Sequence, residues 1–256
     1  MEKWEIATEK FIAEWKKKKE VVGILACGSY VTGNPSAHSD IDIPIILSDK
    51  VDWRERGNKI VDGFLIEYFA NPLKQIRKEF EENYNDNRQV TAHLLATGKV
   101  LYDKDGTVKK LRKEAKAWLN KKLKRSGRIE IEFAKYCIWD ECDNLQSIYK
   151  RKSPSFEFTY YGFLGRILHN YSKFVGHAMS SRYNTFEFLT DRKTQKKYLS
   201  KEFPDRRFVK LFATAMGEHN RDQMMKNAEE LKNYVLDKMG GFNVDEWKVR
   251  TKLDKN

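Results

Sequence analysis

The sequence predicts an α/β domain built on a small mixed sheet, followed by an all-helical bundle domain. Short apolar runs rich in Val, Ile and Phe are concentrated in the first hundred residues, as strands require. Beyond Asp105-Gly106, apolar residues recur almost throughout at helical spacing. We therefore place the border there, with residues 1–105 in the first domain and residues 106–256 in the second.

The elements of the first domain follow from local patterns. An amphipathic helix is predicted over residues 2–19, because it ends in a run of lysines that suits a helix C-terminus. The two-residue turn Asp62-Gly63 predicts a hairpin, and Pro72 suits the first turn of a helix. Strands are expected near residues 21–27, 40–47, 59–62, 64–70 and 99–102, and further helices over 72–83 and 88–97. We expect the helices to lie on one side of the sheet.

The second domain reads as helices separated by a few breaks. These fall near Ser153-Pro154, Ser180-Ser181, Phe203-Pro204 and Gly240-Gly241.

Composition limits the class of protein. With 40% hydrophobic residues over 256 positions, the chain can form an ordinary globular core. No apolar run approaches the ~20 residues that span a bilayer, and the N-terminal residues lack the apolar segment of a signal peptide. Three irregularly spaced cysteines predict neither a disulfide framework nor a zinc site. We expect a cytoplasmic monomer or homodimer.

Two short motifs suggest phosphate and metal chemistry. Gly28-Ser29 ends the first apolar run, and such a turn brings backbone N–H groups and a hydroxyl close to a phosphate. Asp40 and Asp42 begin the next run, ten residues after Tyr30. Side chains two apart on a strand share a face, so both carboxylates should project together. Oxygen ligands of this kind suit Mg²⁺ completed by substrate phosphates.

A third carboxylate supports that interpretation. Glu67 interrupts an apolar run on the second arm of the predicted hairpin. A charge there is costly unless it is paired, bound to metal or turned to solvent on an edge strand. Beside Asp40 and Asp42, we favour a third metal-site carboxylate.

Gly28-Ser29, Asp40-x-Asp42 and Glu67 resemble the catalytic signature of the polymerase-β-type nucleotidyltransferase superfamily. Length and layout are similar to antibiotic nucleotidyltransferases of the kanamycin and lincosamide type. The resemblance implies that the three carboxylates hold one or two Mg²⁺ ions on a nucleoside triphosphate, expected to be ATP. It also implies that Gly28 and Ser29 bind its phosphates. Ser39 either contacts a phosphate as well or braces the loop.

The implied reaction moves a nucleoside monophosphate, expected to be AMP, to a hydroxyl of a small acceptor such as an antibiotic, with release of pyrophosphate. In the resembling enzymes, a carboxylate on an early helix of the second domain acts as general base. Asp143 matches this position best, with Asp140 and Glu141 as alternatives, and an exposed acidic stripe remains the other interpretation. The family pattern often has a Lys one turn later, where this chain has Ser147.

Charge leaves the acceptor open. The net charge is +12, and residues 109–128 hold ten basic residues against Glu114 alone. This run predicts either an RNA-binding or phosphate-steering surface or a solvated helix face. A polycationic aminoglycoside would prefer an acidic cleft, so tRNA or a protein hydroxyl, as in toxin and antitoxin nucleotidyltransferases, is an alternative acceptor. A non-catalytic nucleotide-binding protein of the same fold is a further alternative, although the retained acidic triad argues against it.

Overall fold

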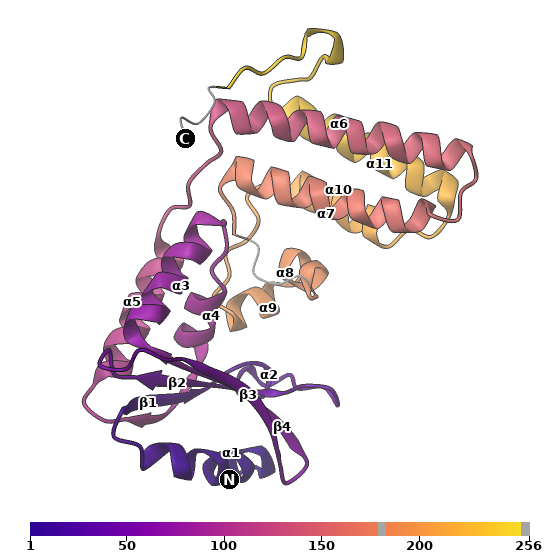
Figure 1. Cartoon of the computed structure of the whole chain (residues 1–256). Coiled ribbons are helices and arrows are strands. Elements are labelled where there is room, and N and C mark those ends of the chain that lie inside the picture. Colours follow the sequence, from indigo (N-terminus) through magenta and orange to yellow (C-terminus); the bar gives the residue numbers. More distant parts are fainter. Residues whose placement is uncertain (179–182, 252–256) are drawn as a thin grey trace. The chain divides into compact units, whose positions relative to one another are not determined.

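The computed structural model describes residues 1–178 and 183–251, which form two compact units (Figure 1). The first unit contains residues 1–122 together with Arg192–Lys201, and the second contains residues 123–178, Asn184–Asp191 and residues 202–251. The predicted break at Ser180-Ser181 lies outside the described residues.

A five-stranded mixed sheet forms the centre of the first unit. Its strands are β1 (Val21–Ala26), β2 (Ile41–Leu47), β3 (Glu55–Val61), β4 (Phe64–Pro72) and β5 (Lys99–Asp103). Their order in the sheet is β3-β4-β2-β1-β5, with β2 and β4 parallel and every other neighbouring pair antiparallel. The predicted mixed sheet is confirmed, with β5 at one edge.

The predicted hairpin joins β3 and β4 at Asp62-Gly63. Both turn residues have positive φ, 50° and 83° respectively, as a two-residue hairpin turn of this kind requires. Strand β3 begins at Glu55 rather than near residue 59. Its residues are mostly exposed on an edge strand, so the first part of the strand carries no apolar pattern that the sequence could reveal.

Helices cover both faces of the sheet, so the expectation of helices on one side was wrong (Figure 1). Helix α1 (Lys3–Lys16) buries Phe11, Ile12 and Trp15 with Ile41 and Ile43 of β2. The opposite face is covered by α3 (Leu73–Asn85), α4 (Val90–Thr97) and α5 (Thr107–Asn120). Apolar residues occur on both faces of β1 and β2, and each face therefore needs a covering layer.

All regular secondary structure among the described residues of the second unit is helical. It contains α6 (Arg128–Lys150), α7 (Phe156–Val175), α8 (Thr185–Thr190), α10 (Arg206–Met216), α11 (Arg221–Lys238) and the short η1 (Val244–Glu246). One apolar core holds α6, α7, α10 and α11 together, which confirms the predicted class of an α/β domain followed by a helical bundle.

Two segments beyond the expected domain border at residue 105 belong to the first unit. Helix α5 belongs to the first unit, because Val108, Leu111 and Ala115 pack into the core beneath α3 and α4. Helix α9 (Arg192–Lys197) also belongs to the first unit, although the chain has already passed through α6, α7 and α8.

Candidate functional site

Three carboxylates meet at the end of the sheet where β2 begins. Asp40 lies immediately before β2, Asp42 lies on β2 and Glu67 on β4. Because β2 and β4 run parallel with Asp42 directly opposite Glu67, their side chains lie on the same face. One oxygen from each carboxylate lies within 4.8 Å of the others. Among the described residues, this is the group of acidic, His or Cys side chains that is arranged to hold a metal ion.

Burial and clustering change the proton affinity of Asp42. Burial, followed by the negative charges of Asp40 and Glu67, raises the pKa of Asp42 to about 7. The Arg56 guanidinium opposes this shift. A carboxylate that is hard to ionise beside two others indicates a site short of positive charge, which a bound cation would supply.

Arg56 is the one basic partner of the triad among the described ion pairs. Its Nη2 donates to Glu67 Oε1 at 2.6 Å, and its guanidinium lies 4.7 Å from the centre of the Phe69 ring. Sequence reasoning missed this residue. The hairpin register pairs Asn58 with Glu67, so Arg56 stands diagonally from Glu67, within reach of a long side chain. The Asp62-Gly63 turn fixes this register, so the predicted hairpin already placed Arg56 within reach of Glu67.

The Gly28-Ser29 turn lies directly against Asp42. Gly28 has a φ of +77°, and a Cβ atom added to it would lie 2.3 Å from Asp42 Oδ2. Both the backbone conformation and the close carboxylate therefore require glycine. The preceding Cys27 N–H donates to the Asp42 carbonyl at 2.8 Å, which ties the turn to β2. The short helix α2 (Ser29–Thr32) begins at Ser29, so this residue stands at the turn as expected.

Ser39 braces the loop that leads into Asp40. Its Oγ accepts from the Ser36 N–H at 2.8 Å, and its own N–H donates to the Ser36 carbonyl. This is the bracing role that the sequence left open.

A further residue of this neighbourhood comes from far along the chain. The hydroxyl groups of Thr32 and Tyr198 lie 3.2 Å apart, and His93 Nδ1 donates to the Tyr198 carbonyl. Tyr198 thus fixes the segment Arg192–Lys201 onto α2 and α4 of the first unit. No local pattern marks it, because the contact spans more than a hundred residues of sequence.

The three candidate bases belong to α6 of the second unit. Glu141 is paired with Arg166 Nε at 2.8 Å, and Asp140 accepts from the Asn144 side chain at 3.2 Å. Asp143 is exposed, and among the described residues no hydrogen bond or ion pair involves its carboxylate. It lines a cavity of about 40 Å³ with Trp139, Cys142, Gln146, Glu229 and Lys232.

Three comparisons relate this chain to known proteins, and the family model that matches it covers residues of the first unit. Residues 9–107 match the family model described as polymerase beta, nucleotidyltransferase. A comparison with curated proteins found no match. Among solved structures, the chain is similar to a nucleotidyltransferase-like protein from Exiguobacterium sibiricum, with 12% identity and a TM-score of 0.46 over 92% of this chain and 75% of that one.

The described helices include none long and apolar enough to cross a membrane.

The matched residues contain the turn at Gly28 and all three carboxylates of the triad. Residues 9–107 of this chain therefore match a nucleotidyltransferase-type domain, over less than half of the chain.

Proposed function

We propose that this protein is a metal-dependent nucleotidyltransferase that moves a nucleoside monophosphate from a nucleoside triphosphate to a hydroxyl group of an acceptor. The observation that supports it is the placement of Asp40, Asp42 and Glu67 within 4.8 Å of one another, against the Gly28 turn. A triphosphate carries several negative charges, so a site made only of carboxylates can bind one through a shared cation.

The chemistry of the donor set fits Mg²⁺. All three side chains offer hard oxygen ligands, and the raised pKa of Asp42 reflects burial and repulsion by Asp40 and Glu67, which a divalent cation would offset. Two oxygens bound to one Mg²⁺ lie at most about 4.2 Å apart, so small side-chain rotations would close the triad. Bound Mg²⁺, as one or two ions, would neutralise the charge that develops on the transferred phosphoryl group.

The residues of the chain have distinct proposed roles. Asp40, Asp42 and Glu67 hold the cation, while the backbone at Gly28 and the Ser29 hydroxyl bind phosphate oxygens of the triphosphate. Ser39 fixes the loop before Asp40, which keeps that carboxylate in place.

In the transfer step, the acceptor oxygen forms a bond to the α-phosphorus, and the bond between the α-phosphorus and the bridging oxygen breaks to release pyrophosphate. The proton of the acceptor hydroxyl passes to a carboxylate, for which we propose Asp143. Its carboxylate is exposed and free of an ion pair among the described residues, whereas Glu141 is held by Arg166. A proton acceptor must be accessible and unpaired, so Asp143 is preferred over Glu141.

Two acceptor classes are proposed. The first is a small hydroxylated molecule such as an antibiotic, with ATP as the nucleotide and AMP as the transferred group. The second is RNA, which the cationic side chains along α5 favour. The chain alternatively binds nucleotide without transferring it, as some proteins with this domain do.

The test measures pyrophosphate release by the purified full-length protein. Each of the four ribonucleoside triphosphates is supplied with Mg²⁺ and a panel of aminoglycosides, lincosamides and RNA, and the labelled acceptor is identified by mass spectrometry. Asp42→Asn is the matched inactive control, because it removes one metal-binding charge without changing side-chain size. Release of pyrophosphate by the wild type and not by Asp42→Asn supports transfer. Nucleotide binding without release for any acceptor identifies the non-catalytic alternative.

A further inference from the structure

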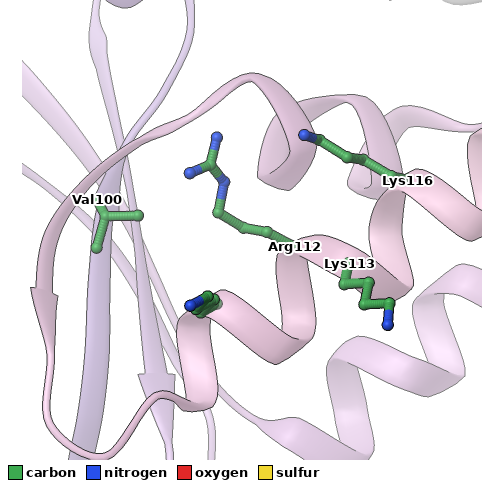
Figure 2. A pocket seen from close by; sticks show the side chains of 5 residues that line it. Val100, Arg112, Lys113 and Lys116 are labelled. Atoms are coloured by element: carbon green, nitrogen blue, oxygen red, sulfur yellow. The ribbon is translucent and has the colours of Figure 1, made fainter.

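Four of the five residues that line a hollow beside α5 are basic, and their aliphatic carbons form most of its surface. Lys109, Arg112, Lys113 and Lys116 of α5 and Val100 of β5 surround a volume of about 430 Å³ (Figure 2). All five residues belong to the first unit. We call this hollow the α5 pocket.

The cations of the α5 pocket form no ion pair with a carboxylate among the described residues. They stand three and four residues apart on one helix, a spacing at which like charges destabilise a helix. Glu114 is the single acidic residue of α5, and Arg77 of α3 binds it through two hydrogen bonds of 3.0 and 2.9 Å. Among the described residues, no carboxylate lines the pocket. The positive charge is therefore left for an anion from outside.

Arg112 gives the pocket a fixed, recessed cation. Its Nη2 donates to the Ala96 carbonyl at 3.2 Å, and its Nε is buried without a hydrogen-bond partner. Figure 2 shows Arg112 extending from α5, with Lys116 projecting to the same side and Lys113 to the other. A guanidinium with unused donors matches the geometry of a phosphate group.

Other cations of the first unit lie outside the α5 pocket. Lys121 and Lys122 follow α5 within the same unit. At about 3.6 residues per turn, Trp118 lies on the face of α5 opposite Lys109 and Lys116. Lys121 lies 4.0 and 4.2 Å from the ring centres of Trp118 and Tyr84, so it belongs to the side of α5 that faces α3.

We propose that the α5 pocket binds the phosphate backbone of an RNA. The choice of RNA rests on the proposed function, because every RNA nucleotide offers a hydroxyl of the class that the transfer reaction uses. The Arg112 fork receives one phosphate, and the lysines along α5 neutralise its neighbours.

The test is direct binding, measured without triphosphate or Mg²⁺ so that it does not depend on transfer. Full-length protein is titrated into a labelled single-stranded RNA of about 20 nucleotides, longer than the usual site size, while anisotropy is followed over a range of salt concentrations. The variant carries Lys109→Gln, Lys113→Gln and Lys116→Gln. The control carries Lys3→Gln, Lys50→Gln and Lys59→Gln, which removes three charges from exposed positions elsewhere in the first unit.

The pocket variant should lose affinity for RNA while keeping its fold. Each lost phosphate contact lowers the slope of log affinity against log salt by about 0.7, so the slope should fall by roughly 2 and binding near 0.1 M salt should weaken by roughly 100-fold. The control should change the slope by less than half of this. Thermal unfolding should show no loss of stability in the pocket variant, because like-charge pairs have been removed. Arg112→Lys, which keeps the charge but loses the fork, should weaken binding by about tenfold.

Several results would overturn the proposal. These are RNA binding that the control weakens as much as the pocket variant does, and no saturable RNA binding at low salt. Binding of anionic lipid vesicles through the same lysines, without RNA binding, would assign the pocket to membranes instead. Pyrophosphate release with a small acceptor but no RNA binding would refute this inference and leave the proposed function intact. RNA binding without pyrophosphate release for any acceptor would support this inference and refute the proposed transfer reaction.

Discussion

Asp42→Asn should stabilise the protein without metal, and the stabilisation should grow with pH. In the folded protein the pKa of Asp42 is about 7, against an ordinary value of 3.8, because of burial and the charges of Asp40 and Glu67. The folded state therefore binds a proton more tightly than the unfolded chain does. The sign follows from linkage: the folded state gains stability as pH falls from 7 towards 3.8, and loses it as pH rises through 7.

The size of the effect can be worked out from these two pKa values. Relative to low pH, the titration of Asp42 lowers the free energy of unfolding by about 4 kcal/mol at pH 8 and by roughly 1.7 kcal/mol at pH 5, at about 1.36 kcal/mol per unit of pKa. Asn cannot ionise and keeps nearly the same shape. The free energy of unfolding of Asp42→Asn, relative to wild type, should thus be larger at pH 8 than at pH 5 by about 2–3 kcal/mol.

Urea unfolding in EDTA, followed by circular dichroism at pH 5, 6, 7 and 8, measures this difference. Comparing two proteins that differ at one side chain cancels the titration of all other groups. Adding Mn²⁺ or Mg²⁺ after removal of EDTA should stabilise wild type and leave Asp42→Asn nearly unchanged. A difference between the two proteins that does not vary with pH would refute the argument that Asp42 is enclosed in a repulsive cluster.

Four further variants test the rest of the site. Gly28→Ala should lower the free energy of unfolding by roughly 1–3 kcal/mol in urea titrations and abolish transfer, because its Cβ would lie 2.3 Å from Asp42 Oδ2 at a positive φ; an active, fully stable variant would contradict this. Arg56→Gln should tighten Mn²⁺ binding by roughly tenfold in calorimetry, since the cation paired with Glu67 at 2.6 Å is removed; weaker binding would mean that Arg56 helps to form the metal site. Asp143→Asn should slow transfer by roughly 10²- to 10⁴-fold without weakening nucleotide binding, whereas Glu67→Gln should weaken both. Full activity of Asp143→Asn would move the base to another group.

The sequence alone determined the features that depend on neighbouring residues. The Asp62-Gly63 turn, the apolar runs of β1 and β2, and the buried stripe of α5 follow from local backbone preferences and from periods of 2.0 and 3.6 residues. The candidate carboxylates Asp40, Asp42 and Glu67 stood out for the same reason, because each interrupts or borders an apolar run. A local signal also existed for Arg56 once the hairpin register was known.

Only the tertiary structure decided how these pieces meet. The parallel pairing of β2 with β4 sets Glu67 opposite Asp42, although β3 comes between these two strands in the sequence. The periodicity of a single strand does not determine which strands become neighbours in the sheet. Helix α1 packs on the sheet face that α3, α4 and α5 leave uncovered, and the sequence of α1 alone does not identify that face. The return of Arg192–Lys201 to the first unit through Tyr198 depended on a contact with Thr32 and His93 across more than a hundred residues. Such contacts form because the folded chain offers a matching surface, and no window of sequence contains both partners.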